Sequence, residues 1–327
     1  MTAITYLDAI SQAMREEMRR DDAVFLLGED VGAYGGAFKV SAGFMEEFGP
    51  ERVIDTPMSE TAIIGSAVGA ALMGMRPIAE MQYIDFITCG FDQIINMASK
   101  MYWRVGMPVP MVIRGPSGGG TKGGPFHSSS PEAWFFHTPG IKVVVPSTTY
   151  DAKGMLKAAI RDNNPVLFLE HKLLYRQPEL REELPDDDYI VPLGKAIVRR
   201  EGEDMTMLTY GAMVYQCLKA ARLLEEEDDL AVEVVDLRSL TPLDRETIME
   251  SVRHTNKVLI VHEDTLTGGI GAELAALLAE ELFEYLDGPI TRVAAPDAPF
   301  PYAPPLEAAF LPNAEKIVTA ARKLAAY

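Results

Sequence analysis

Short apolar runs alternate with segments of helical periodicity through the first half of the chain. The runs are rich in β-forming residues, whereas segments such as 61–74 and 149–162 repeat their apolar residues at helical spacing. Strands that alternate with helices are typical of a parallel sheet covered by helices. We therefore predict an α/β fold, with strands at 23–30, 76–82, 110–115, 141–147 and 165–170.

The alternation lapses after Glu170 and then resumes. Residues 171–189 are charged, contain two prolines and show little periodicity, which is typical of a connection between domains. Beyond them, apolar runs again alternate with helical patterns, which predicts a second α/β domain. Its expected strands lie at 205–211, 231–237, 257–263 and 289–295, and its expected helices at 215–224, after Thr241 and at 272–283.

These patterns predict two α/β domains, residues 1–180 and 201–327, joined by a linker at 181–200. The helix expected after Thr241 has a start signal of its own. Pro242 follows Thr241, and Asp244 comes third in the expected helix, as in a capped helix start.

Length and composition agree with two soluble domains. The chain has 327 residues, of which 48% are hydrophobic and 24% charged, and chains of this length divide into domains of about 100 to 200 residues. No apolar run approaches the ~18 residues that a membrane span needs. The first twenty residues form an amphipathic helical pattern without the basic-then-apolar order of a signal peptide. We therefore expect a cytoplasmic protein.

Charge and cysteine content exclude several classes of function. A net charge of −18 repels phosphate backbones, so nucleic acid is not an expected partner. The same charge favours encounter with a basic protein module, or serves solubility alone. Cys89 and Cys217 are far apart and the five histidines lack metal-ligand spacing, so we predict neither disulfides nor a zinc site. Both cysteines are expected to be buried.

Glu60 opens a predicted helix built from small and apolar residues. A carboxylate in the first helical turn interacts favourably with the helix dipole, and a buried carboxylate there is equally suited to a ligand nitrogen. Downstream, Gln82, Tyr83, Asp85 and Phe86 combine polar and aromatic groups, which suits a flat heterocycle as well as a core. The residues alone leave these alternatives open.

Two glycine-rich stretches are further candidates. His127 stands in the loop GGTKGGPFHSSSPEAW, 119–134, where a lone histidine is either a catalytic group or a hydrogen-bonded bystander. The stretch GGIGAEL, 268–274, is an incomplete G-x-G-x-x-G. It leaves a non-catalytic dinucleotide-binding or scaffold protein as the second hypothesis, and a structural strand-to-helix turn as the plain explanation.

Five motifs in order along nearly the whole chain resemble one family. They are GEDVG at 28–32, FGPERVIDTPMSE at 48–60, AAIRDNNPV at 158–166, VVDLRSLTPLD at 234–244 and HEDTLTGG at 262–269. The chain is similar to the beta subunits of the thiamine-diphosphate-dependent 2-oxo acid dehydrogenases, the first components of the pyruvate, branched-chain 2-oxo acid and acetoin complexes. The resemblance implies a pyrimidine-binding domain followed by a transketolase C-terminal-like domain.

The resemblance also implies a reaction, the oxidative decarboxylation of a 2-oxo acid and the reductive acylation of a lipoyl group. Glu60 matches the glutamate that hydrogen-bonds the cofactor's aminopyrimidine ring, with Met58, Gln82 and Phe86 beside that ring. His127 matches the histidine of an H-S-Q-S motif and would give a proton to a dithiolane sulfur. The chain departs from the family at Ser129, where glutamine is usual, and in a shorter 101–110 segment.

Two kinds of cation are implied by the resemblance. A potassium site would use backbone carbonyls and an aspartate from Met111, Ala159, Ile160, Asp162 and Asn164, where a plain helix C-terminus is the alternative. The Mg²⁺ that holds the cofactor diphosphate needs a G-D-G…N motif, which this chain lacks, so it is expected from an alpha subunit.

The implied assembly contains two alpha and two beta chains. The C-terminal end near Tyr327 is expected to dock a basic domain of the lipoyl-bearing acyltransferase. The sequences of 167–176 and 262–269 resemble those of the branched-chain enzymes more than the others, so a branched-chain substrate is favoured, with pyruvate and acetoin as alternatives. A transketolase-type enzyme completed by a longer partner chain is a further alternative.

Overall fold

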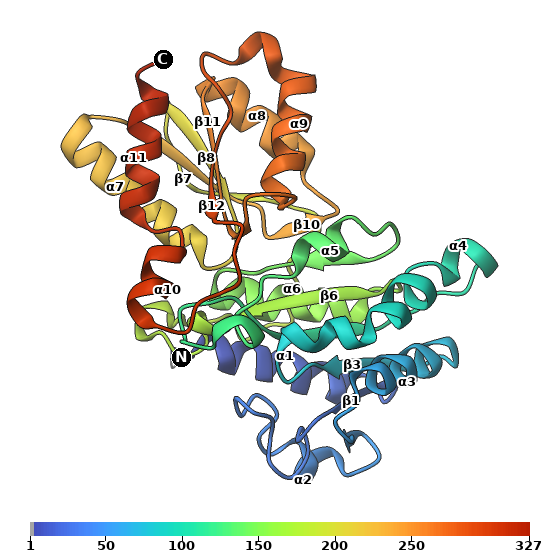
Figure 1. The fold of residues 1–327 in the computed structure, drawn as a ribbon. Coiled ribbons are helices and arrows are strands. Elements are labelled where there is room, and N and C mark those ends of the chain that lie inside the picture. Colours follow the sequence, from blue (N-terminus) through green and yellow to red (C-terminus); the bar gives the residue numbers. More distant parts are fainter. Residues whose placement is uncertain (1–2) are drawn as a thin grey trace. The chain divides into compact units, whose positions relative to one another are not determined.

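The computed structural model describes residues 3–327, which form two compact units (Figure 1). The first unit contains the residues up to Ser117 together with 134–193. The second contains 118–133 together with 194–327. The loop that carries His127 therefore belongs to the second unit, although most of its sequence neighbours belong to the first.

The first unit is built on a parallel sheet whose strands run in the order β5-β6-β4-β3-β1-β2. All five expected strands are confirmed, and the structure adds β2, whose three residues are too few to show a periodic pattern. The bounds are β1 (Val24–Gly28), β2 (Val53–Asp55), β3 (Arg76–Glu80), β4 (Val112–Ser117), β5 (Lys142–Val144) and β6 (Val166–His171).

Two groups of helices accompany this sheet. Helix α1 (Tyr6–Arg20), which begins with a capping box between Thr5 and Asp8, packs against α6 (Thr149–Arg161). Helix α3 (Glu60–Leu72) packs against η1 (Ile84–Gly90) and η2 (Gln93–Ala98). The shorter helices are α2 (Phe44–Phe48), α4 (Met101–Val105), α5 (Glu132–Phe136), η4 (Lys172–Leu174) and η5 (Pro178–Leu180).

The second unit has a sheet in the order β12-β11-β8-β9-β7, parallel except for its edge strand β7. Helices α7 and α11 pack together on one face, and α8 and α9 on the other (Figure 1). The strands are β7 (Ile197–Arg200), β8 (Met205–Thr209), β9 (Val232–Asp236), β10 (Ser239–Thr241), β11 (Val258–Thr265) and β12 (Thr291–Ala295). The helices are α7 (Met213–Asp228), α8 (Arg245–Thr255), α9 (Ile270–Leu282), α10 (Pro304–Phe310), α11 (Ala314–Ala325), η3 (Gly124–Phe126) and η6 (Phe283–Tyr285).

The predicted helix start at Thr241 is wrong. Thr241 ends β10, the peptide bond to Pro242 is cis, and α8 begins only at Arg245. Asp244 is the N-cap itself, and its carboxylate accepts a hydrogen bond from the backbone N–H of Thr247 at 3.4 Å. The prediction placed the cap at Thr241, the last residue of β10, three positions before the N-cap that the structure shows.

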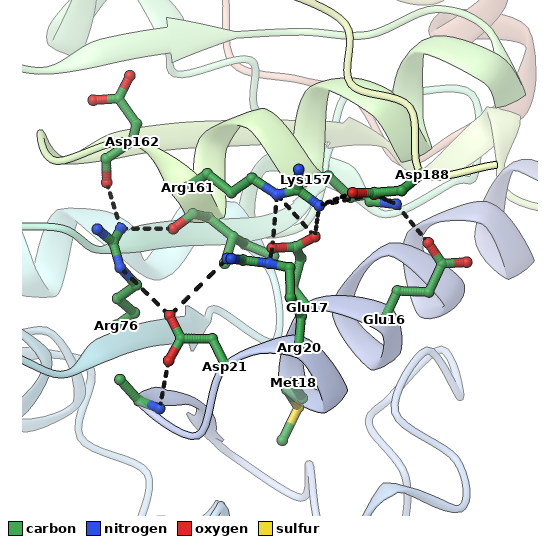
Figure 2. Close-up of polar contacts among 12 residues, drawn as sticks. Glu16, Glu17, Met18, Arg20, Asp21, Arg76, Lys157, Arg161, Asp162 and Asp188 are labelled. Carbon is green, nitrogen blue, oxygen red and sulfur yellow. Dashed lines mark hydrogen bonds and ion pairs between the residues drawn. The ribbon is translucent and has the colours of Figure 1, made fainter.

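Residues 181–193 belong to the first unit by their contacts. Glu182 forms a β-bridge with Ile4, and the ring of Tyr189 stacks on that of Tyr150 at 4.4 Å between centroids. Asp188 pairs with Lys157 and Arg161 of α6 (Figure 2). The charges that made this stretch resemble a linker are therefore partners for the basic face of α6.

The expectation for the cysteines holds for Cys217, which is buried, and is wrong for Cys89, which is exposed. In η1 the buried residues Ile84, Ile87 and Gly90 recur every third position, as the 3₁₀ repeat of three residues per turn requires. Cys89 therefore faces away from the core. Between residues 3 and 327 no helix is long and apolar enough to cross a membrane.

Candidate active site

Glu60 is the first residue of α3, at the end of a short connection from β2. The Ser59 side chain makes no capping bond, so the Glu60 carboxylate is the acidic group of the first turn, where the helix dipole stabilises a negative charge. Met58 lies next to it in the chain and is 82% exposed. The connection thus presents a carboxylate and an uncovered apolar side chain together.

A second carboxyl group, which the sequence analysis missed, lies near Glu60. Glu29 follows β1 and is almost fully buried. Burial raises the pKa of Glu29, and the negative charges of Glu60 and Asp30 raise it further. Glu29 therefore keeps a proton to higher pH than an ordinary glutamate. The GEDVG motif marked this position, but only folding places it within electrostatic range of Glu60.

Gln82 and Phe86 reach the same edge of the sheet. Strands β1 and β3 are parallel neighbours with Gly28 beside Glu80, so the residues that follow them emerge side by side. The side-chain amide of Gln82 donates to the carboxylate of Asp30 at 3.4 Å. Phe86, half-buried in η1, belongs to the helix that packs on α3. The structure therefore brings all four expected ring-binding residues to one region of the first unit.

A buried ionic network supports this edge. Arg114 of β4 pairs with Glu80 of β3 and with Glu170 of β6, whose carboxylate also accepts the Tyr175 hydroxyl at 2.6 Å. Burial lowers the pKa of Arg114, but the charges of Glu170 and Glu80 more than offset it, so the guanidinium stays charged. Removing one member would leave the others as buried charges without compensation. The network thus ties the carboxyl ends of three adjacent strands together.

The five residues expected to hold potassium converge at the C-terminus of α6. The carbonyl oxygens of Ile160 and Asp162 accept hydrogen bonds from the Arg76 guanidinium at 3.0 and 2.9 Å (Figure 2). The Met111 carbonyl, brought alongside by the pairing of β4 with β6, accepts the N–H of Val166 at 3.0 Å. Carbonyl oxygens at a helix C-terminus attract cations. Here a cationic side chain already uses two of them.

The carboxylate of Asp162 has its own partners. It pairs with the Lys142 ammonium and accepts the backbone N–H of Asn164 at 2.8 Å. Partial burial would raise the pKa of Asp162, but these hydrogen bonds lower it below its ordinary value. Apart from such carbonyl sites, residues 3–327 contain no group of three or more His, Cys, Asp or Glu side chains that could hold a metal ion.

His127 lies in the second unit, directly after η3, and is half-buried. A Cβ on Gly123 would lie 2.6 Å from the His127 carbonyl oxygen, so the glycine permits the close return of the chain. The Ser129 carbonyl accepts the N–H of Gly118 at 3.0 Å. The serine that replaces the usual glutamine therefore closes the base of the loop through its backbone.

The loop ends at Glu132, a buried carboxyl group that the sequence analysis missed. The Tyr210 hydroxyl donates to Glu132 at 2.7 Å. Burial, followed by the negative charges of Asp264 and Glu263, raises the pKa of Glu132 to about 8. No local pattern distinguishes this glutamate from an exposed one.

The glycines of GGIGAEL have a packing role. A Cβ on Gly269 or Gly271 would lie 2.6 or 2.7 Å from ring atoms of His262, so the start of α9 lies directly on that imidazole. His262 is fully buried, and burial lowers its pKa to about 4. These glycines let α9 approach β11, which supports the structural explanation of the motif.

Comparison with known proteins gives two domains that agree with the two units except for residues 118–133, which lie within the first family match but in the second unit. Residues 2–178 match the family of the transketolase pyrimidine binding domain, and residues 194–317 match the transketolase C-terminal domain. The chain is 52% identical to the 2-oxoisovalerate dehydrogenase subunit beta of Bacillus subtilis over 330 aligned residues, which cover 100% of both chains. The chain belongs to the 2-oxo acid dehydrogenase beta subunits. The family resemblance and the α/β fold class are thereby confirmed.

Beta subunits of pyruvate dehydrogenase are also similar to this chain, at lower identity. The pyruvate dehydrogenase E1 component subunit beta of Bacillus subtilis is 44% identical over 99% of each chain. Among solved structures, a split-gene transketolase, an inactive beta4 tetramer, matches with a TM-score of 0.81 at 26% identity over 99% of each chain. The family is one of thiamine-diphosphate-dependent oxidoreductases, and this chain is accordingly an enzyme subunit.

Proposed function

We propose that this subunit serves the oxidative decarboxylation of a branched-chain 2-oxo acid and the reductive acylation of a lipoyl group. The observation that carries the substrate class is the difference in identity between two relatives from one organism. The 2-oxoisovalerate dehydrogenase subunit is 52% identical and the pyruvate dehydrogenase subunit 44% identical. Pyruvate and acetoin are the competing substrates.

The edge formed by β1, β3 and α3 fits an aminopyrimidine ring. A carboxylate at a helix start, the exposed Met58, the amide of Gln82 and the ring of Phe86 are the donor, acceptor and apolar groups that such a ring needs. Bound thiamine diphosphate supplies the carbanion chemistry. Glu60 would hold a proton at a ring nitrogen, and its carboxylate is close enough to Glu29 to raise the pKa of Glu29.

His127 would act later, by giving a proton to the lipoyl sulfur as the acyl group is transferred. Its half-buried position in a glycine-rich loop leaves the imidazole accessible to a carrier. An imidazole suits this role because its ordinary pKa lies near neutral pH. His127→Ala should therefore reduce lipoyl acylation much more than decarboxylation measured with an artificial electron acceptor.

The proposal includes partners. As a beta subunit the chain would assemble with an alpha subunit into a heterotetramer, and the alpha chain would hold most of the Mg²⁺ ligands. The acyltransferase would dock at the C-terminal end, where a cavity of about 620 Å³ is lined in part by Pro289, Lys323 and Tyr327. A cytoplasmic location is also part of the proposal, and it is supported by the bacterial relatives but not by the mitochondrial ones.

The substrate is tested with the complex reconstituted from this chain, its alpha subunit and a lipoylated acyltransferase. We expect the highest kcat/KM with 3-methyl-2-oxobutanoate, compared with pyruvate and acetoin. Glu60→Gln is the mechanistic control and should reduce turnover of every substrate about 100-fold without preventing assembly, as for a lost acid–base group. A preference for pyruvate or acetoin would overturn the branched-chain assignment.

A further inference from the structure

The segment 300–307 contacts the loop that carries His127 and restrains its backbone. Glu307, in α10, is 5% exposed, and its carboxylate oxygen Oε1 accepts two backbone N–H groups of the loop. These come from Gly120 at 3.0 Å and from Lys122 at 3.1 Å. One carboxylate oxygen that accepts the amides of two loop residues, with one residue between them, fixes the direction of the backbone there.

The rings of Phe300 and Tyr302, which precede Glu307 in the chain, pack against glycines of the same loop. A Cβ on Gly119 would lie 2.1 Å from the ring of Phe300, and one on Gly124 would lie 2.1 Å from the ring of Tyr302. Gly124 also has a φ of +64°, in the left-handed region. Both glycines therefore accommodate a ring where any side chain would collide. Phe300 is itself supported by Phe310, whose ring centroid lies 4.8 Å away.

A second carboxylate anchors the first residues of the loop. Glu263, near the end of β11, is 7% exposed and accepts the N–H of Gly119 at 2.6 Å. The hydroxyl of Ser130 also donates to it, at 3.4 Å. His127 thus lies between two anchored stretches, one before it and one after it.

These contacts are important because the loop sequence by itself is flexible. Five of the seven residues in 118–124 are glycines, and glycine gives the backbone its greatest conformational freedom. Proton transfer, by contrast, requires the donor to be held in reach of the accepting atom. Some element outside the loop must therefore fix its geometry.

We propose that residues 300–307 form a clasp that fixes the 118–133 loop and that Glu307 is a positioning residue for His127. The link to catalysis rests on the proposed role of His127 in lipoyl acylation. The clasp itself rests on the contacts of Phe300, Tyr302 and Glu307 alone. In this clasp the nearly buried carboxylate of Glu307 accepts backbone N–H groups of the loop, and the two aromatic rings cover loop glycines.

The experiment compares Glu307→Ala with Glu307→Gln in the holoenzyme assembled with its alpha subunit. The amide oxygen of glutamine can accept the same two N–H groups, so Glu307→Gln should keep most of the activity. Glu307→Ala should reduce lipoyl acylation about tenfold or more, on the scale of a misplaced proton donor. It should change decarboxylation with an artificial acceptor less than about threefold. Glu284→Ala, an exposed glutamate in η6, is the matched control.

Hydrogen exchange provides a readout that does not depend on the reaction. The amides of Gly120 and Lys122 should exchange faster in Glu307→Ala than in Glu307→Gln or Glu284→Ala. Unchanged exchange would overturn the clasp. Faster exchange with unchanged lipoyl acylation would leave the clasp standing and overturn the positioning role. Should Glu307→Ala not fold, Tyr302→Ala tests the same exchange prediction at Gly124, where slow exchange would contradict the clasp.

A failure of the proposed function is recognised separately. If His127→Ala acylates lipoyl groups normally, His127 has no role in the transfer and Glu307 cannot position it for one. The exchange measurement still decides whether the clasp exists. The two proposals can therefore fail independently.

Discussion

At the residue scale, the carboxyl groups of this chain differ more than their identical chemistry suggests. Glu60 is the acidic residue in the first turn of α3. Glu29 and Glu132 have raised pKa values because burial and neighbouring negative charges oppose ionisation. Arg114 is buried and remains charged because two carboxylates surround it. The folded environment therefore decides which side chains carry protons.

The raised pKa of Glu132 predicts how the folding stability of the protein depends on pH. Its pKa rises from an ordinary 4.5 to about 8 in the folded chain. Below pH 4.5 the group is protonated in both states, and its full contribution to stability is present. Between pH 4.5 and about 8 the group ionises in the unfolded chain while it stays protonated in the folded one, so stability is lost over this range and the loss is complete above it. The charged groups facing Glu132 are Asp264 and Glu263, with the Tyr210 hydroxyl as donor.

Glu132→Gln should therefore weaken the pH dependence of stability. Glutamine is neutral at every pH and can still accept the Tyr210 hydroxyl. We expect the Tm of the variant to exceed that of the wild type by about 3 °C or more at pH 9 and to match it near pH 4.5. Scanning calorimetry measures both, with exposed Glu284→Gln as the control. Parallel Tm curves for variant and wild type would show that Glu132 ionises normally.

At the element scale, the ends of helices carry much of the chemistry. The N-terminus of α3 presents Glu60, and the C-terminus of α6 gathers carbonyl oxygens around Arg76. Both follow from the unpaired backbone groups that every helix leaves at its ends. The cation bound at the C-terminus of α6 therefore depends on the groups at that helix end.

Potassium should stabilise the end of α6 more than sodium does. A bound ion adds stability according to its concentration and affinity, so the Tm of the assembled protein should be higher in KCl than in NaCl of equal ionic strength. Asp162→Ala should abolish the difference between the two salts, whatever it does to the Tm itself. Equal melting of the wild type in both salts would contradict a potassium site and leave the side chains of Arg76 and Lys142 as the cations at this helix end.

At the scale of the whole molecule, the chain is proposed to be half of an active site. It offers groups for the aminopyrimidine ring but lacks the G-D-G…N sequence that holds a diphosphate with Mg²⁺. The subunit character of its relatives supports the same conclusion. The net charge of −18 adds a long-range preference for basic partner surfaces.

Thiamine diphosphate should therefore bind tightly only to the assembled complex. Isothermal titration with Mg²⁺ present should detect tight binding to the chain co-expressed with its alpha subunit, and at least about 100-fold weaker binding to the isolated chain. Most of the ligand's charged contacts would then come from the partner. Tight, Mg²⁺-dependent binding to the isolated chain would refute the half-site proposal.

The sequence by itself determined the two α/β sheets, most of their strands and the family. Alternating strand and helix patterns are local, and the motif around Glu60 is contiguous, so both can be recognised without coordinates. It misassigned Thr241 and Cys89 because strand ends and the 3₁₀ repeat of η1 depend on tertiary packing. Strand β2 was not predicted because its three residues are too few to show a periodic pattern.

Only the tertiary structure decided which distant residues act together. It placed Glu29 within range of Glu60, gave Glu132 its buried environment and brought Glu307 to the loop of His127 across nearly 190 positions of sequence. Proton affinity depends on burial and on the charges nearby, and loop geometry depends on contacts from outside the loop. Local sequence patterns predict neither the proton affinities nor the loop geometry, because both arise only when segments distant in sequence pack together and exclude water.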